Sequence, residues 1–203
     1  MPIRNIVFDI GNVVVPWDPH AIVRDALGDE RVDQPGFRSP FARSETWIAV
    51  NRGEHSLEEA KPLFIERHGL ADDEVDRLYQ ALFDSMVLLE GTVPLMRDLA
   101  AAGHRLFALT DNVREIVAHL RRRYDFWDLF EHAAVSAEIG VLKPDPRIYQ
   151  HLIDAGSLDP QETLFFDDLP RNVAGAEAVG MIGRVFTTAQ AARCDLAQLD
   201  VIM

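Results

Sequence analysis

The residues best suited to chemistry are carboxylates that end apolar stretches of the chain. Asp9 interrupts an apolar run over residues 4–15, directly after residues 6–8, which are typical of a strand buried on both faces. A carboxylate is costly to bury there without a partner. Because ligands of open α/β sheets bind beyond the carboxyl ends of the strands, Asp9 is placed where chemistry would occur. The alternative is an Asp that caps a turn before Gly11.

Asp167 and Asp168 form a carboxylate pair at the end of the apolar run 164–166, and Asn172 follows at a spacing that suits the next helix. If this pair converges with Asp9, the charges repel: two carboxylates about 4 Å apart cost on the order of 4 kcal/mol at an effective dielectric of roughly 20. A cation is then required, and hard oxygen ligands suit Mg²⁺, which commonly bridges carboxylates to a substrate phosphate. The alternative is a solvated turn.

Two further groups are expected at the same edge of the sheet. Thr110 ends a predicted strand, and Asn112 stands at the start of a helix whose free N–H groups would attract a phosphate oxygen. N-capping by Asn112, with Glu115 three residues on, is the alternative and is compatible with that role. Lys143 lies in a loop stiffened by Pro144 and Pro146, from which it would offset clustered negative charge; the alternative is an isolated surface lysine.

The elements that would position these residues alternate between strand and helix from Thr92 onward. Further strands are predicted at 104–110, 133–136, 163–167 and 182–186, and helices near 92–103, 112–123, 146–155, 171–179 and 188–199. Such alternation predicts a parallel sheet. Residues 16–88 show helical periods instead. Helices are predicted there near 20–28 and 38–51, after Ser56 with its possible capping box to Glu59, and after Asp72.

Composition limits the class of protein. The 203 residues suffice for one core plus an insertion, and 48% hydrophobic with 26% charged residues is ordinary for a globular protein. The net charge of -13 argues against a nucleic-acid partner. The basic run Arg121-Arg122-Arg123 falls where a helix should end, so it complements the helix C-terminus.

Location follows from what the sequence lacks. The single cysteine, Cys194, cannot form an internal disulfide, and this fits a reducing compartment. The sequence has neither an apolar stretch long enough for a membrane span nor a recognisable export signal. We therefore expect a cytoplasmic protein without a membrane partner; its oligomeric state is left open.

The order of these sites resembles the four motifs of the haloacid dehalogenase-like hydrolase superfamily. The matching segments are Asp9-Ile10-Gly11-Asn12-Val13, Thr110 after an apolar strand, Lys143 before Pro144, and Phe166-Asp167-Asp168 followed by Asn172. The resemblance covers nearly the whole chain and is nearest to bacterial α-glucose-1-phosphatase-like sugar phosphatases. It implies a Rossmann-like, doubly wound α/β core of residues 1–15 and 89–203, with an inserted helical (C1) cap over 16–88.

The resemblance also implies roles for the matching residues. Asp9 would attack phosphorus and form an aspartyl-phosphate, Thr110 would hold the phosphoryl group, and Lys143 would stabilise that group and the nucleophile. The implied Mg²⁺ ligands are Asp9, Asp168 and the Gly11 backbone carbonyl. Asp167 would belong to the metal site mainly by orienting a metal-bound water or Lys143.

Substrate contacts are expected from both parts of the chain. Around the nucleophile, the candidates are Gly11, Asn12 and Asn112. In the cap, polar and aromatic groups suited to a sugar phosphate cluster on one predicted helix, at Arg43, Trp47, Asn51 and Arg52. A tryptophan such as Trp47 is more often a core residue than a binding platform.

Gly11 departs from the family pattern. Most phosphatases of this superfamily carry there a second Asp that acts as general acid and base, a role worth about 10²- to 10⁴-fold, or roughly 3 to 5 kcal/mol of barrier. Water or another acid, with Asp18 and Asp167 as candidates, could replace it. Alternatively, the leaving group needs little protonation, or the protein is slow or non-catalytic. The anomeric oxygen of a sugar 1-phosphate leaves more easily than an ordinary sugar alkoxide.

The sequence thus predicts a Mg²⁺-dependent phosphomonoesterase that acts on a small sugar phosphate. A metal-independent 2-haloacid dehalogenase is an alternative, but extra carboxylates beside its nucleophile would gain it nothing. A phosphate- or partner-binding relative that lost turnover is a second alternative, because fold alone does not imply function.

Overall fold

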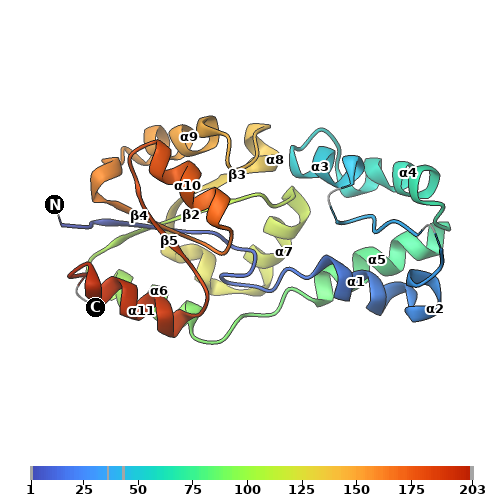
Figure 1. The fold of residues 1–203 in the computed structure, drawn as a ribbon, viewed down its shortest axis with the longest axis horizontal. Coiled ribbons are helices and arrows are strands. Elements are labelled where there is room, and N and C mark those ends of the chain that lie inside the picture. Colours follow the sequence, from blue (N-terminus) through green and yellow to red (C-terminus); the bar gives the residue numbers. More distant parts are fainter. Residues whose placement is uncertain (1, 36, 43, 202–203) are drawn as a thin grey trace.

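The computed structural model describes residues 2–35, 37–42 and 44–201 and has two lobes (Figure 1). One lobe is a sheet with helices on both sides, and the other contains only helices. Strand β1 (Asn5–Phe8) runs from the N-terminal end of the sheet toward the helical lobe. The carboxyl ends of the strands therefore face the helical lobe.

The sheet is parallel throughout, with strand order β3-β2-β1-β4-β5. After β1 its strands are β2 (Arg105–Thr110), β3 (Phe130–Val135), β4 (Thr163–Asp167) and β5 (Ile182–Val185). The helices of this lobe are α6 (Thr92–Ala101), α7 (Arg114–Arg123), α8 (Ser136–Ile139), α9 (Pro146–Gly156), α10 (Pro170–Ala178) and α11 (Ala189–Gln198), with short 3₁₀ turns at Asp125–Leu129 and Pro160–Glu162. The predicted doubly wound α/β fold is confirmed.

Alternate side chains of β1 pack on opposite faces of the sheet. Ile6 and Phe8 join the apolar cluster that contains residues of α6, α7 and α11, whereas Val7 joins the cluster built with α9 and α10. All three side chains are completely buried. This explains why the strand reads as a continuous apolar run: neither face of the sheet meets water.

The second lobe consists of α1 (Pro19–Leu27), α2 (Asp29–Val32), α3 (Glu45–Asn51), α4 (Leu57–His68) and α5 (Asp72–Asp84). The predicted capping box is present: Ser56 Oγ accepts from the Glu59 N–H, and the Glu59 carboxylate accepts from the Ser56 N–H. Apolar residues of these helices, among them Phe64, Val75 and Leu78, are buried between them.

At the helix starts, one prediction and one alternative interpretation are wrong. The helix predicted over 38–51 begins only at Glu45, because the Ser44 side chain caps it by accepting from the Trp47 N–H. Asn112 does not cap α7, whose N-cap residue is Val113. The Glu115 carboxylate, expected to support that cap, instead accepts from the Leu57 N–H at the start of α4.

The chain leaves the sheet lobe and returns to it at neighbouring points. Leu89, after α5, donates its N–H to the carbonyl of Val14 at 2.8 Å. The Thr92 hydroxyl, at the start of α6, donates to the carbonyl of Val13 at 2.7 Å. The two connections between the lobes therefore lie side by side.

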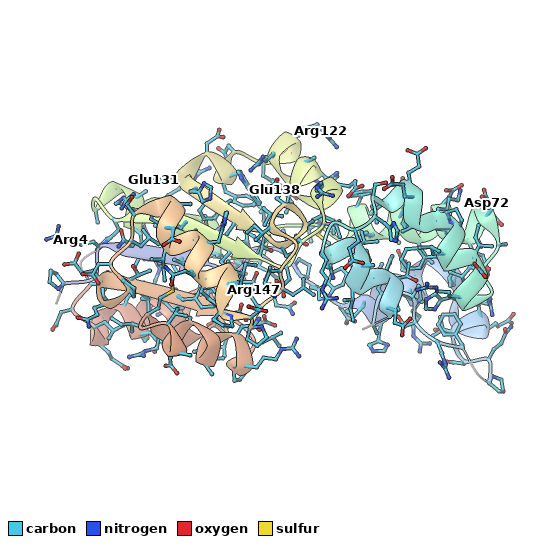
Figure 2. All side chains as sticks on the ribbon, turned by 90° about the horizontal axis from the view of Figure 1, so that it is seen from above. Arg4, Asp72, Arg122, Glu131, Glu138 and Arg147 are labelled. Carbon is cyan, nitrogen blue, oxygen red and sulfur yellow. The ribbon has the colours of Figure 1, made fainter. Side chains whose placement is uncertain are left out.

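Figure 2 shows charged side chains on the outside of both lobes, with Arg4 at the far end of the sheet lobe and Asp72 at the far end of the helical one. Cys194 is exposed and unbonded. Among the helices of the described residues, none is long and apolar enough to cross a membrane.

Candidate active site

A cavity of about 690 Å³ lies between the two lobes, at the carboxyl ends of β1, β2 and β4. The sequence-predicted residues Asp9, Gly11, Asn12, Trp47, Thr110, Asn112, Lys143 and Asp168 all line it. Asp167 lies behind this wall and is completely buried. Arg43 lies outside the described residues. Chain topology thus gathers residues that are far apart in the sequence around one cavity.

Lys143 connects the two buried carboxylates of the site. Its Nζ lies 2.9 Å from Asp9 Oδ1 and 2.7 Å from Asp167 Oδ2, and it also donates to the Leu109 carbonyl at 3.1 Å. The Lys143 side chain is 1% exposed and that of Asp167 is 0% exposed. Every N–H of the ammonium group therefore has an acceptor, as a buried charge requires.

Asp167 is held from several sides. Its Oδ1 accepts from the Leu169 N–H at 2.9 Å, and the Asn172 amide donates to both of its carboxylate oxygens, at 3.0 and 3.1 Å. With Lys143 on Oδ2, both oxygens are occupied by protein donors. Asp167 is thus arranged to orient Lys143 and the loop after β4.

Asp168 points the other way and is only partly buried. Its Oδ2 accepts from the Asn12 amide at 2.9 Å, and Asn12 Oδ1 in turn accepts from the Trp17 N–H at 2.8 Å. Asn12 has a left-handed backbone, with φ of 54°, which an Asn tolerates better than most residues. Both polar ends of the Asn12 side chain are therefore used within the protein.

The carboxylates form a donor set that fits a divalent cation. Oxygen atoms of Asp9, Asp167 and Asp168 lie within 4.8 Å of one another. Within the described part of the chain, Asp9 Oδ2 and Asp168 Oδ1 have no hydrogen-bond partner, and neither does the buried Oδ1 of Asn172. Three carboxylates against a single lysine leave negative charge uncompensated. Hard oxygen donors with this excess charge fit Mg²⁺.

The pKa values reflect the same excess of charge. Burial raises the pKa of Asp9 to about 8, against the opposing pull of the Lys143 charge. Burial also raises the pKa of Asp168, although its bond from Asn12 lowers it. For Lys143, burial disfavours the charged form, but Asp9, Asp167 and Asp111 outweigh it and its pKa is raised. A bound cation would keep Asp9 ionised.

The loop after β2 forms the second wall of the cavity. Thr110 is 1% exposed, and its Oγ accepts from the Asn112 amide at 2.8 Å, which leaves the hydroxyl hydrogen free to donate. Asp111 Oδ1 accepts from the Lys143 backbone N–H at 2.9 Å and so ties this loop to the lysine loop. Asn112 thus orients Thr110 instead of capping a helix.

Neither of the two carboxylates that the sequence offers in place of the acid missing at Gly11 is available for that role. Asp18 caps α1, where its Oδ1 accepts from the N–H groups of His20 and Ala21. Asp167 has both oxygens bonded to other protein groups. Neither candidate from the sequence has a free carboxyl group beside the nucleophile.

The wall from the helical lobe is aromatic. Trp17 stacks on Trp47, with ring centroids 5.5 Å apart and an interplanar angle of 9°, and Phe41 packs against Trp47 at 4.7 Å. Trp47 is 5% exposed, so most of it is core. Asn51 also lines the cavity, whereas Arg52 does not and lies 3.9 Å from Glu54.

A turn after α3 docks the helical lobe on the sheet lobe. The Ser136 hydroxyl donates to the Asn51 carbonyl at 2.8 Å, and the Arg114 guanidinium donates to the Gly53 carbonyl at 3.1 Å. A Cβ added at Gly53 would lie 1.9 Å from the Ala137 carbonyl oxygen. Gly53 is therefore required for this close approach.

Two cavity residues were not predicted as site residues. Trp17 lines the cavity beside Gly11. The sequence feature that could have identified it is its position as an aromatic residue shortly after the segment that contains Asp9. Arg171 is exposed at the start of α10, and its charge helps to lower the pKa of Asp111 against the dominant effect of burial. No sequence pattern distinguishes Arg171 from an ordinary surface arginine.

Known proteins of similar sequence include several phosphatases. A sesquiterpene phosphatase from Aspergillus oryzae is 28% identical over 95% of this chain and 94% of its own length. A flavin mononucleotide hydrolase from Arabidopsis thaliana is 29% identical over 76% of this chain and 62% of its own length. The chain spans only 34% of a drimenol cyclase from Aspergillus calidoustus, at 23% identity.

Solved structures share the fold at lower identity. A predicted HAD-like family hydrolase from Porphyromonas gingivalis superimposes with a TM-score of 0.76 at 24% identity over the full length of both chains. A HAD family enzyme from Bacteroides thetaiotaomicron, in complex with magnesium and inorganic phosphate, gives a TM-score of 0.74 at 19% identity over 90% of this chain and 93% of that one. Residues 3–180 match the family model of haloacid dehalogenase-like hydrolases, and the chain belongs to this family of enzymes.

Proposed function

We propose that this hydrolase is a Mg²⁺-dependent phosphomonoesterase that works through an aspartyl-phosphate intermediate. It acts on phosphoric monoesters, in keeping with the family and with the phosphatases among its relatives. The observation that carries the proposal is the cluster of Asp9, Asp167 and Asp168 around Lys143, beside the Thr110 hydroxyl. A small phosphorylated metabolite is the partner that the cavity accommodates.

Each residue has a task that its contacts support. Asp9 attacks phosphorus through Oδ2, the oxygen that has no bond to Lys143, and the charge of Lys143 favours the ionised carboxylate against the effect of burial. The Thr110 hydroxyl donates to an oxygen of the transferred group. Asp9, Asp168 and the Gly11 carbonyl would hold Mg²⁺, which supplies positive charge to the phosphoryl oxygens when bound. Asp167 orients Lys143.

Gly11 restricts the leaving group. With no acid at this position, substrates must expel an oxygen that needs little protonation. The anomeric oxygen of a sugar 1-phosphate meets this requirement, and such a sugar phosphate is the substrate that the sequence predicts. Residues 16–88 act as the cap that covers the reacting group, and residues 1–15 with 89–203 form the catalytic core.

The dehalogenase alternative receives less support. Asp168 is partly exposed to the cavity next to the nucleophile, and a carboxylate there would repel a halocarboxylic acid unless a cation lay between them. One of the dehalogenases among the solved structures, an L-2-haloacid dehalogenase, shares the fold at 19% identity, which does not bear on activity.

A single assay tests the proposal. Purified protein is incubated with p-nitrophenyl phosphate and a panel of sugar phosphates, in Mg²⁺ or in EDTA, beside Asp9→Asn. We expect Mg²⁺-dependent phosphate release that Asp9→Asn abolishes, and glucose 1-phosphate to be hydrolysed faster than glucose 6-phosphate. Equal release by wild type and Asp9→Asn would overturn the nucleophile assignment, and activity that survives EDTA would favour the dehalogenase type of chemistry.

A further inference from the structure

Trp17 lies next to Gly11, the position at which related phosphatases carry their general acid. A Cβ added at Gly11 would have the Trp17 Cβ, 3.5 Å away, as its nearest neighbour. Trp17 is partly buried and lies in the cavity wall, with Trp47 stacked on it and Phe41 behind Trp47. The leaving group therefore departs on a side of the nucleophile where an indole ring lies next to Gly11, the position at which related phosphatases carry an acid.

The two side-chain amides on this side of the cavity, Asn12 and Asn51, are already engaged. Asn12 uses both ends of its side chain, on Asp168 and on the Trp17 N–H. Asn51, with its amide oriented to match its neighbours, donates to the Asp111 carbonyl at 3.2 Å and accepts from Trp47 Nε1 at 3.1 Å. A leaving group with many hydroxyls, such as a sugar, would have several of them buried here without hydrogen-bond partners, and each such hydroxyl would cost binding free energy.

The facing wall of the sheet lobe adds apolar surface. Leu142 and Leu169 line the cavity, and Leu169 keeps 38% of its surface exposed. An exposed leucine in the mouth of a binding cavity is available to pack against a ligand. A flat apolar body would thus meet aromatic rings on one side and leucines on the other.

We infer that the substrate is an aryl phosphate, the phosphate monoester of a phenol, with its ring packed against Trp17. This inference rests on the proposed phosphatase function and assigns it a different substrate class from the sugar phosphate that the sequence predicts. Two independent observations meet in it: the missing acid selects a leaving group that departs unprotonated, and the aromatic wall selects a flat apolar one. Trp17 is the specificity residue.

The reaction needs no proton from the protein in its first step. An Asp9 oxygen bonds to phosphorus while the bond from phosphorus to the phenolic oxygen breaks, and the electron pair leaves on that oxygen. A phenol has a pKa of about 10, so the phenolate is a stable leaving group that later takes its proton from water. Water then attacks phosphorus, the bond to Asp9 breaks, and inorganic phosphate leaves as the water proton passes to solvent.

Binding of phosphonates separates the ring contact from the chemistry, because phosphonates carry the anionic group but are not hydrolysed. Phenyl-, cyclohexyl- and methylphosphonate are titrated calorimetrically into the Mg²⁺-loaded protein. We expect phenylphosphonate to bind on the order of tenfold more tightly than methylphosphonate, with cyclohexylphosphonate between them, because stacking adds to the burial of area. Equal binding of phenyl- and methylphosphonate would overturn the inference.

Two variants assign the effect to Trp17. In Trp17→Ala, the preference for phenyl- over methylphosphonate should fall below about threefold, and in Trp17→Phe most of it should remain. Methylphosphonate binding reports on the folding of the site in each variant. Trp127→Phe is the matched control, because Trp127 is buried outside the cavity, and it should keep the full preference. An unchanged preference in Trp17→Ala would refute the role of Trp17.

Kinetics distinguish failure of this inference from failure of the proposed function. If phenyl phosphate is hydrolysed with a higher kcat/KM than glucose 1-phosphate, and Trp17→Ala raises KM for phenyl phosphate but not for the ringless acetyl phosphate, both stand. If glucose 1-phosphate is the better substrate, the phosphatase function stands and the aryl inference fails. If no ester is hydrolysed, the proposed function fails, and the inference about its substrate fails with it.

Discussion

Asn12 donates a hydrogen bond of 2.9 Å to Oδ2 of Asp168, across 156 positions of sequence. The bond joins the loop after β1 to the loop after β4 and fixes one carboxylate of the candidate metal site. Partners of this kind, which orient a ligand without touching the metal, typically change metal affinity or activity by about 10- to 100-fold when they are removed.

Asn12→Gly should therefore weaken Mg²⁺ binding by about tenfold, because Asp168 loses the bond that orients it. Glycine accepts the φ of 54° at this position, so the variant removes the side chain without backbone strain. The measurements are the Mg²⁺ concentration for half-maximal activity and the rise in Tm that Mg²⁺ produces. Ser157→Gly, at an exposed position with φ of 50°, is the control and should leave both unchanged.

Lys143→Met should lower the free energy of unfolding by about 3 to 5 kcal/mol in EDTA, because Asp9 and Asp167 then stay buried without their cation. Urea unfolding measures the change. Lys61→Met is the control: Lys61 bridges the exposed Asp72 and Asp76 on the helical lobe, and its loss should cost less than about 1 kcal/mol. Similar losses in both variants would contradict the buried ion cluster.

The metal-free protein should lose stability as pH rises from about 4 to 8. The pKa of Asp9 is raised by burial from 3.8 to about 8, so the folded state holds this proton more tightly than the unfolded state does. The stabilisation is complete below the unfolded pKa and is lost as pH rises toward the folded pKa, with a slope of about 1.4 kcal/mol per pH unit, the value for one proton. Urea unfolding in EDTA at pH 5 to 9 should show a smaller slope in Asp9→Asn than in wild type.

Gly11→Asp should restore the missing acid. A Cβ at this position makes only an ordinary contact with Trp17, so a side chain fits. We expect at least a tenfold gain in kcat on alkyl phosphates, a lower bound set below the roughly 10²- to 10⁴-fold that general acid catalysis typically contributes, and little gain on p-nitrophenyl phosphate. Gly11→Asn has the same size without the acid. Identical rates for the Asp and Asn variants would show that proton donation does not limit the enzyme.

Gly53→Ala should push the two lobes apart where they dock. The added Cβ would collide with the Ala137 carbonyl oxygen, and KM for the substrate should rise at least fivefold because the cavity opens. Gly69→Ala is the control, with φ of 62° and open space around its Cβ. It carries the same backbone strain, about 1 to 2 kcal/mol, without the collision, and should leave KM unchanged.

The sequence predicted correctly those features that depend on residues close together in the chain. The apolar run of residues 6–8 predicts a strand, and the spacing of Ser56 and Glu59 predicts a capping box; both predictions are confirmed. The strand-end positions of Asp9 and Asp168 followed from the alternation of strand and helix. Their convergence is a property of the strand order, which places β4 next to β1.

The remaining features depend on partners distant in the sequence. Glu115 had the right spacing to support a cap at Asn112, but the N–H of Leu57 in the other lobe takes its carboxylate. The stacking of Trp17 on Trp47 depends on how α3 packs at the cavity, and the hydrophobic periodicity of the sequence does not predict that packing. The use of both ends of the Asn12 amide depends equally on Asp168 and on the chain entering the helical lobe.

The bond from the Leu89 N–H to the Val14 carbonyl brings the chain back almost to the point at which it left the sheet lobe. The pairs of β1 with β2 and with β4 contain no residue of 16–88, so the register of these strands does not depend directly on that segment. With the roles proposed above, a change confined to residues 16–88 would alter the selection of substrate and leave the bond-breaking groups of the sheet lobe in place. The same junction gives the protein engineer a single place at which to graft a different lid.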